Sequence, residues 1–412
     1  MAAAFVSAAA AFIRLFVKQQ DLVLLISCQN DEPSQDILDL AAAIEEVAAQ
    51  QKKTRVKVIS GRMDRSIGGA FSFVGKLLSM LKEIAAAKIV VLDAYCPAVS
   101  IPRKRKDQKV VQIWHAPEAI KKFSLQITDT PAGYSSQTTK ILKMHKNYDY
   151  ILCPAEATLP FFEEAFGYPK SAFVKYGLPS LKRLGSVKKP QTGEAESQAR
   201  IETKKTIQER YPELGAKDVS SQSDKPLIIV YAPTFRDGTD LDVAGLIAAF
   251  EQTMPEIMIV LKLHPLDYVK NTLHASTSEG SLDEVWIRDE SCVIKDSEFP
   301  LIDWYAAADL IVTDYSGVAV EAAAAGVASY YYIYDIDEYK ERRGINVDLR
   351  EEAVGKYALK DANELASQVL CDFGSREAIS YDYKALSEFR DKYLEVPLED
   401  NANTLAEFIL NC

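Results

Sequence analysis

The stretch that decides the fold is ADLIVTDYSGVAVEAAAAG, residues 308–326. An apolar run ends near Asp314 and strong helix formers follow Gly317, which predicts a buried strand, a tight loop and a helix. Three other stretches have the same form: KVVQIWHA (109–116), PLIIVYAPTFRD (226–237) and EIMIVLKLHP (256–265). In open α/β sheets, ligands bind at the carboxyl ends of parallel strands. The four stretches therefore predict polar side chains gathered at strand ends, in a pattern suited to a phosphate-containing ligand.

Strand-like and helical patterns alternate along both halves of the chain. In the first half, strand-like runs at 21–27, 54–60 and 88–95 alternate with helical patterns at 36–50 and 75–87. Such alternation predicts βαβ units and a parallel sheet. We therefore expect an α/β protein with two Rossmann-like domains that face a central cleft.

The expected boundaries follow from composition. Residues 185–225 are rich in Lys, Gln, Glu and Ser and show little apolar periodicity apart from a possible helix near 194–210, which predicts an interdomain connection plus the first helix of a second domain. The expected segments are an N-terminal amphipathic helix (1–20), an N-terminal Rossmann-like domain (21–184), the connection (185–225), a C-terminal Rossmann-like domain (226–384), and C-terminal helices that pack back toward the N-terminal domain (385–412).

Bulk composition excludes several classes of protein. The chain has 412 residues, 48% hydrophobic residues and a net charge of −11, which fits a globular protein of two or three domains and argues against a general nucleic-acid binder. The six cysteines form no C-x-x-C pair, so neither a zinc knuckle nor a redox motif is indicated. A Walker A motif is also absent from the sequence.

The first twenty residues, MAAAFVSAAAAFIRLFVKQQ, have apolar residues at helical spacing. Arg14 and Lys18 follow the apolar run, whereas a signal peptide carries its positive charges before it. The helix either packs on its own domain or lies in a membrane interface. The basic run RKRKDQK (103–109) has two similar interpretations, a solvated loop or a contact with an anionic membrane surface.

In residues 314–326, Ser316 is expected to be the N-cap of the following helix. The first turn of that helix offers unpaired N–H groups and a positive dipole end to an anion. Gly317 would let a ligand approach the backbone, and Glu321 would reach a ribose hydroxyl. The alternative is that Ser316 only caps the helix.

Two further strand ends carry basic groups. His264 lies at the end of a predicted strand, where Pro265 stops the strand pairing. It would donate a hydrogen bond to phosphate, and the alternative is a loop histidine without such a role. The neighbouring stretch brings Thr234 and Arg236, whose forked guanidinium suits phosphate. The alternative for Arg236 is a surface ion pair with Asp237.

In the N-terminal half, His115 ends a strand, and Lys121 and Lys122 follow it. A histidine at that position would be a general base for an incoming hydroxyl group. The alternative is a core histidine stacked on Trp114.

Together these stretches resemble the CDP-glycerol glycerophosphotransferase family, the teichoic-acid primases and polymerases. The resemblance runs from roughly residue 88 to residue 350. Its landmarks are QIWHAPEAIKKF (112–123), DYILCPAEATLPFFEEAFGY (149–168) followed by YGLP (176–179), YAPTFRD (231–237), KLHP (262–265), ADLIVTDYSGVAVE (308–321) and YYIYDIDEYKERRGINVDL (331–349).

The resemblance implies a GT-B-like fold in which the C-terminal domain binds most of the activated donor and the N-terminal domain receives the acceptor. It implies transfer of glycerol phosphate or ribitol phosphate from CDP-glycerol or CDP-ribitol to a hydroxyl of a lipid-linked or polymeric acceptor, with release of CMP. The product would be a teichoic-acid-like cell-surface polymer. The protein would be cytoplasmic and peripheral on the inner face of the cell membrane.

The resemblance also assigns residues. His115 occupies the place of the histidine that acts as base in the family's Trp-His-Gly motif, and His264 that of a histidine which helps to bind donor phosphate. The candidate donor-binding residues are Thr234, Arg236, Lys262, Thr313, Asp314, Ser316, Gly317 and Glu321. Lys121 and Lys122 are assigned to the acceptor side. We expect no metal or other cofactor, because Arg236, His264 and the helix dipole would neutralise charge on the diphosphate.

Three departures from the family pattern concern the details. Ala116 replaces the Gly of the Trp-His-Gly motif, Gly317 replaces a second Ser, and residues 177–184 lack the usual Arg and Asp after Gly-x-Pro. The last departure makes a different polyol phosphate or acceptor more plausible. The alternatives are a GT-B glycosyltransferase that uses a UDP- or CMP-sugar and a non-catalytic, membrane-associated relative that binds polymer.

The pair Asp335 and Asp337 in DID resembles metal-binding Asp-x-Asp pairs of other nucleotide-sugar transferases. Its place in a polar loop before EYKERR favours solvated or helix-capping carboxylates instead.

Overall fold

The computed structural model describes residues 2–29, 32–51, 54–60, 70–116, 119–190, 193–215, 225–236, 241–254, 256–263, 292–375, 378–399 and 401–412. The chain forms two compact units. The N-terminal unit comprises Met1–Lys182 and Tyr393–Cys412, and the C-terminal unit comprises Arg183–Lys392.

The N-terminal unit is built on a six-stranded sheet in the order β2-β1-β3-β4-β5-β6. Every neighbouring pair of strands is parallel. The strands are β1 (Leu22–Ser27), β2 (Arg55–Ser60), β3 (Ile89–Leu92), β4 (Lys109–Gln112), β5 (Tyr150–Leu152) and β6 (Phe173–Val174). All six residues of β1 are buried, as expected for a strand covered on both faces.

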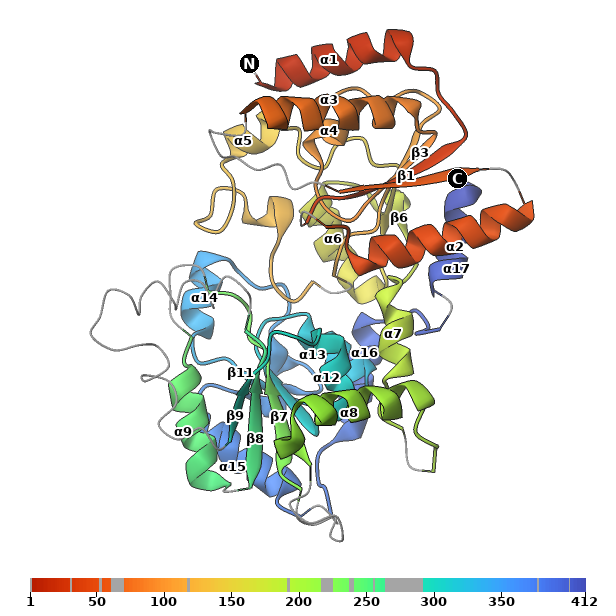
Figure 1. Ribbon diagram of the computed structural model, residues 1–412. Coiled ribbons are helices and arrows are strands. Elements are labelled where there is room, and N and C mark those ends of the chain that lie inside the picture. Colours follow the sequence, from red (N-terminus) through yellow and green to blue (C-terminus); the bar gives the residue numbers. More distant parts are fainter. Residues whose placement is uncertain are drawn as a thin grey trace. The chain divides into compact units, whose positions relative to one another are not determined.

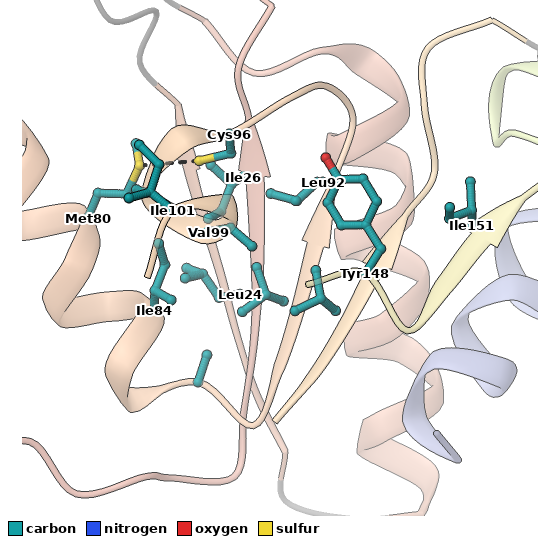
Figure 2. Close-up of a cluster of buried hydrophobic side chains, with 14 of the residues drawn as sticks. Leu24, Ile26, Met80, Ile84, Leu92, Cys96, Val99, Ile101, Tyr148 and Ile151 are labelled. Carbon is teal, nitrogen blue, oxygen red and sulfur yellow. Dashed lines mark hydrogen bonds between the residues drawn. The ribbon is translucent and has the colours of Figure 1, made fainter. Parts of the chain in front are cut away.

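Side chains of β1 alternate between two hydrophobic cores. Leu24 and Ile26 join the core shown in Figure 2, which also contains Met80, Leu92 and Tyr148. Val23 and Leu25 join a second core on the other face of the sheet.

Helices cover both faces. Their bounds are α1 (Ala2–Phe16), α2 (Gln35–Gln51), α3 (Ala70–Ala86), α4 (Pro97–Ser100), α5 (Ser136–Ile141), α6 (Leu159–Phe166) and α17 (Asn401–Leu410). Helix α7 (Ser180–Ser186) begins in this unit and ends in the C-terminal unit. Helix α1 packs against α3, and α17 packs against α2, so the two ends of the chain lie on the same unit (Figure 1). No helix within the described ranges is both long enough and apolar enough to cross a membrane.

The C-terminal unit has a second parallel six-stranded sheet, in the order β12-β11-β10-β7-β8-β9. The strands are β7 (Leu227–Tyr231), β8 (Ile257–Leu261), β9 (Val293–Lys295), β10 (Leu310–Thr313), β11 (Ala328–Tyr332) and β12 (Ala358–Leu359). The predicted α/β class with two Rossmann-like sheets is confirmed.

The helices of the C-terminal unit are α8 (Gln198–Arg210), α9 (Val243–Thr253), α12 (Leu301–Ala307), α13 (Val318–Ala324), α14 (Ile336–Arg342), α15 (Ala362–Phe373) and α16 (Tyr383–Tyr393). Short 3-10 helices are η2 (Ser124–Ile127), η3 (Glu156–Thr158), η4 (Lys170–Ala172), η5 (Pro212–Leu214), η7 (Leu349–Glu351) and η8 (Gly355–Tyr357).

Helix α8, which lies in the segment predicted as a connection, is part of the C-terminal unit. Ser197 caps it, because its Oγ accepts a hydrogen bond from the backbone N–H of Arg200 at 3.1 Å. The buried guanidinium of Arg200 donates to the carbonyl oxygens of Val187 (2.7 Å) and Tyr305 (3.0 Å). These bonds fix α8 against α12 despite its low apolar content.

Candidate functional site

Three of the four quoted strands lie side by side in the C-terminal sheet. Strand β7 is central, with β10 on one side and β8 on the other. Tyr231 is opposite Val312 in one pair and opposite Leu261 in the other. The loops that follow these strands therefore begin at the same edge of the sheet, where an α/β protein binds its ligand.

Asp314 joins two of these loops. Its carboxylate accepts hydrogen bonds from the backbone N–H of Thr234, at 3.0 Å to each oxygen. It also pairs with the Arg236 guanidinium at 2.8 Å, and both side chains are only 3% exposed. Asp314 therefore ties the loop after β10 to the loop after β7.

The guanidinium of Arg236 points into the protein. Its Nε and Nη2 donate to the two oxygens of Asp335 at 2.7 and 3.1 Å, and its Nη1 donates to the carbonyl oxygen of Thr234 at 2.8 Å. It also lies over the rings of Tyr315 (5.4 Å) and Tyr339 (5.0 Å), which stack on each other. In this arrangement Arg236 has the role of an ion-pair partner for Asp314 and Asp335, and direct contact with phosphate would require these ion pairs to open.

Electrostatics agree with that role. Burial disfavours the charge of Arg236, but Asp314 and Asp335 outweigh it and raise the pKa of the guanidinium above its usual value. The alternative partner Asp237 lies outside the described residues. The prediction for the DID loop is corrected for one of its carboxylates: Asp335 stands at the N-cap position of α14, but its half-buried carboxylate pairs with Arg236 and makes no capping hydrogen bond. Asp337 is exposed and pairs with Lys360 at 2.6 Å.

Two threonines of this edge behave differently. The Thr313 hydroxyl donates to the carbonyl oxygen of Ala232 at 2.7 Å, so it contributes to the connection between β10 and β7. The Thr234 hydroxyl is buried and has no hydrogen-bond partner within the described structure. A buried hydroxyl without a partner is costly, so among the predicted donor-binding residues the Thr234 hydroxyl has hydrogen-bonding capacity left for a polar ligand.

The start of α13 differs from the prediction by one residue. Gly317, not Ser316, is the N-cap, and no side chain caps the helix. The half-buried Ser316 accepts a long hydrogen bond of 3.4 Å from the backbone N–H of Val318. Glu321 accepts a hydrogen bond from the Tyr305 hydroxyl at 2.9 Å, so one of its oxygens faces α12.

Lys262 takes part in a network of hydrogen bonds and ion pairs around Asp296. Its ammonium donates to the Asp296 carboxylate (2.9 Å) and to the carbonyl oxygens of Asp296 (3.1 Å) and Phe299 (2.7 Å). An ammonium has three N–H donors, so these three contacts account for all of them.

Asp296 is the centre of that network. Its carboxylate also accepts hydrogen bonds from Trp304 Nε1 (2.7 Å) and the Tyr211 hydroxyl (2.8 Å). Burial opposes ionisation, but the hydrogen bonds from Lys262, Trp304 and Tyr211 lower the pKa of Asp296 to about 2. His264, the predicted phosphate ligand two residues after Lys262, lies outside the described residues.

His115 follows β4 in the N-terminal unit, next to Trp114. Its Nδ1 lies 3.1 Å from the carbonyl oxygen of Asp93, which leaves Nε2 as the position that can accept a proton. The ring lies against Trp114, with the two ring centroids 4.2 Å apart and the planes tilted by 36°, but His115 is exposed and not part of the core that the alternative interpretation required. Desolvation by the surrounding protein lowers the pKa of His115, and the positive charge of Lys121 lowers it further. Lys121 and its neighbour Lys122 are half-buried.

Sequence reasoning missed the residues that position these groups. The Asp93 carboxylate is fully buried and accepts hydrogen bonds from Ser27 Oγ (2.6 Å), Ser34 Oγ (2.9 Å) and the Cys28 N–H (3.0 Å). The carboxylate therefore fixes the loops after β1 and β3 beside His115. An aspartate directly after the buried run IVVL was the available signal.

The family described as CDP-Glycerol:Poly(glycerophosphate) glycerophosphotransferase matches residues 7–411. The chain belongs to this family. The predicted family and the predicted class of enzyme, a glycerophosphotransferase-like transferase, are thus confirmed.

Two similar proteins match this chain over nearly the full length of both sequences. A teichoic acid ribitol-phosphate primase of Bacillus spizizenii is 27% identical over 95% of this chain and 91% of the relative. A teichoic acid glycerol-phosphate primase of Bacillus subtilis is 24% identical over 99% and 96%.

Solved structures give the fold. The wall teichoic acid polymerase TagF aligns with a TM-score of 0.66 and 17% identity, covering 98% of this chain and 93% of TagF. A UDP-GlcNAc 2-epimerase from Neisseria meningitidis aligns with a TM-score of 0.56 and 12% identity, covering 95% and 100%. These likenesses confirm the predicted GT-B-like architecture.

Proposed function

We propose that this protein transfers a polyol phosphate from a CDP-activated donor to an acceptor hydroxyl in the synthesis of a teichoic-acid-like polymer, with release of CMP. The observation that carries this proposal is the family match over residues 7–411. Relatives named as ribitol-phosphate and glycerol-phosphate primases both match the chain over nearly its full length, so glycerol phosphate and ribitol phosphate are both candidates for the transferred group.

In the proposed reaction, an acceptor oxygen attacks the β-phosphorus of the CDP-polyol. A new P–O bond forms, the bond between the β-phosphorus and the bridging oxygen breaks, and CMP leaves with that oxygen. The acceptor proton moves to Nε2 of His115. The contact between His115 Nδ1 and Asp93 supports this role, because it selects the tautomer that has Nε2 free, and the lowered pKa keeps the ring neutral near pH 7.

Donor binding is proposed for the strand ends of the C-terminal unit. The Thr234 hydroxyl, Ser316 and the backbone around Gly317 would contact the diphosphate, with His264 as a further donor. Asp314, Arg236 and Lys262 would act indirectly, because their ion pairs fix the loops that carry those groups. Thr313 would support the same loop, and Glu321 would face the ribose. We propose that no metal is required.

A lipid-linked acceptor is proposed to bring the protein to the membrane surface. Helix α1 supports this, because Phe5, Phe12, Leu15 and Phe16 are 51%, 64%, 77% and 73% exposed. An apolar face of this kind buries readily in a lipid interface. The basic run at 103–106 lies close by, since the Arg105 guanidinium donates to the carbonyl oxygen of Val17 at 2.6 Å. We therefore propose a peripheral location on the inner face of the cell membrane.

The test is a donor assay with the full chain and three donors: CDP-glycerol, CDP-ribitol and a UDP-sugar. Each is incubated with and without a lipid-linked acceptor while CMP and UDP are measured. The proposal requires acceptor-dependent CMP release from one CDP-polyol, and UDP release alone would show a glycosyltransferase. His115→Ala should lower CMP release by about 10²–10⁴-fold, the usual contribution of a general base. Near-normal release would exclude His115 as the base.

A further inference from the structure

Left-handed backbone is concentrated beside the proposed base. Within the described residues, the non-glycine residues with positive φ all lie between 114 and 147: Trp114 (60°), Ser124 (55°), Asp129 (62°), Lys143 (46°), His145 (58°) and Asn147 (76°). Residues with a Cβ rarely adopt this conformation, and it persists where surrounding structure enforces it. Two of these residues, Trp114 and Ser124, contact the side chain of a third, His145.

His145 links these strained segments. Its ring is 1% exposed and lies among Tyr95, Trp114 and Phe166, with centroid distances of 5.5, 6.2 and 5.1 Å. Nε2 lies 2.5 Å from Ser124 Oγ, and Nδ1 lies 3.2 Å from the Tyr148 hydroxyl. Burial lowers the pKa of His145 to about 3, so the ring is neutral and bridges two hydroxyl groups.

A path of side-chain interactions continues from His145 to the residue before His115. The Tyr148 hydroxyl, whose ring lies in the core of Figure 2, interacts with the side chain of Gln112. Gln112 Oε1 accepts the backbone N–H of Trp114 at 2.9 Å, and its Nε2 donates to the carbonyl oxygen of Ala94 at 3.1 Å. The indole of Trp114 in turn lies against the ring of His115.

Each end of this path fixes a different part of Trp114. Gln112 fixes its backbone N–H, whereas His145 and Phe166 contact its indole, the latter edge-on at 5.2 Å. The same His145 also fixes Ser124, the first residue of η2, which follows the loop that leaves His115. Loss of His145 would therefore loosen both sides of the His115 segment at once.

We propose that His145 is a positioning residue for His115: through Ser124, Tyr148 and Gln112 it holds Trp114 in its left-handed conformation and so sets the direction of the His115 ring. This role rests on the proposed function, in which His115 accepts the acceptor proton. His145 itself would touch neither donor nor acceptor.

The test uses substitutions that divide the two hydrogen bonds of His145. His145→Asn retains a nitrogen near the Nδ1 position and tolerates positive φ, whereas His145→Gln retains one near Nε2. His145→Phe retains a ring and loses both bonds. We expect His145→Phe to lower kcat about 10- to 100-fold through misplacement of the base, with KM for the CDP-polyol changed less than about twofold. His145→Asn should recover part of kcat, because it preserves the Tyr148 link.

Tyr148→Phe supplies a second variant with a matched control. It removes only the hydroxyl in the path and should lower kcat with KM unchanged. Tyr168→Phe removes a neighbouring hydroxyl that accepts the Tyr148 N–H at 3.0 Å and has no place in the path, so its kcat should stay within about twofold of wild type. Equal effects of the two tyrosine substitutions, or wild-type kcat in His145→Phe, would overturn the proposal.

Near-ultraviolet circular dichroism gives a readout independent of activity. His145→Phe and Tyr148→Phe should change the tryptophan bands, because Trp114 leaves its fixed setting, and Tyr168→Phe should not. Unchanged tryptophan bands in a folded His145→Phe protein would refute the positioning role, even if the donor assay succeeds. If the wild-type protein released no CMP but His145→Phe altered the tryptophan bands, the proposed function would be refuted. The inference that His145 fixes the setting of Trp114 would still stand.

Discussion

Replacement of Arg236 by Met tests whether that residue stabilises the fold or binds phosphate. In the structure its guanidinium is 3% exposed and pairs with Asp314 at 2.8 Å and with Asp335 at 2.7 Å. Met fills much of the same volume but leaves two carboxylates without their cation. Breaking a buried ion pair by removing one partner destabilises a protein by about 3–5 kcal/mol. We expect a loss of that size in the free energy of unfolding.

The assay is urea unfolding followed by circular dichroism and tryptophan fluorescence, combined with titration of CDP-glycerol at low urea. Arg236→Met should lower the unfolding midpoint strongly, whereas the fraction that remains folded should bind CDP-glycerol with an affinity within about tenfold of wild type, a binding difference of about 1.4 kcal/mol. Arg236→Lys should fall between wild type and Met, because it keeps the charge and loses the forked geometry. Arg210→Met is the matched control, since its pair with Glu298 is exposed and contributes little.

One result would refute this reasoning. If Arg236→Met unfolded at the wild-type urea concentration and lost more than about 100-fold in CDP-glycerol affinity, the guanidinium would be a ligand contact and not a structural cation. The ion pairs seen here would then open when donor binds.

Three further predictions follow from the same structure. The pKa of His115 is lowered below 6.5, and the neutral ring is the proposed base. A plot of kcat/KM against pH should therefore rise with a midpoint below pH 6.5 and be level at pH 7. A midpoint above pH 7 would contradict this prediction. Asp296 has a folded pKa of about 2, below its unfolded value near 3.8, so its stabilisation is present above about pH 4 and is lost as pH falls toward 2; Asp296→Asn should flatten acid unfolding in that window, measured by circular dichroism. Replacement of Phe12 and Leu15 by Ser should weaken sedimentation with anionic vesicles at least about tenfold, because each buried apolar side chain contributes about 1.5–3 kcal/mol, whereas Ile379→Ser on the C-terminal unit should leave it unchanged.

Much of the fold was predictable from local pattern. Short apolar runs such as residues 308–313, followed by polar groups and helical spacing, specify a buried strand and its crossover helix, because the period of hydrophobic residues decides which faces are buried. The order of motifs also indicated the family. The position of His115 after β4 was predicted for the same reason, since a strand end is defined within a few residues of sequence.

The partners of the site residues were less predictable. Arg236 and Lys262 were expected to meet phosphate, yet each is paired with aspartates far along the chain, Asp335 and Asp296. A sequence shows that a charge is present at a strand end but not whether another loop brings an opposite charge to it. The Asp-x-Asp pair shows the same effect, because Asp335 pairs with Arg236 from another loop. The N-cap of α13 is Gly317, one residue after the predicted Ser316.

The sequence by itself thus determined the strands, the helices, the two parallel sheets and the family, since all of these depend on neighbouring residues or on the order of motifs. Only the tertiary structure decided which polar groups are available for chemistry. It paired Arg236 with Asp314 and Asp335, left the Thr234 hydroxyl without a partner among the residues that the structure describes, and buried His145 against Ser124 and Tyr148. The physical reason is that burial and hydrogen bonding between distant segments set the reactivity of a side chain. Local periodicity sets only the strand, helix or loop position from which that side chain extends.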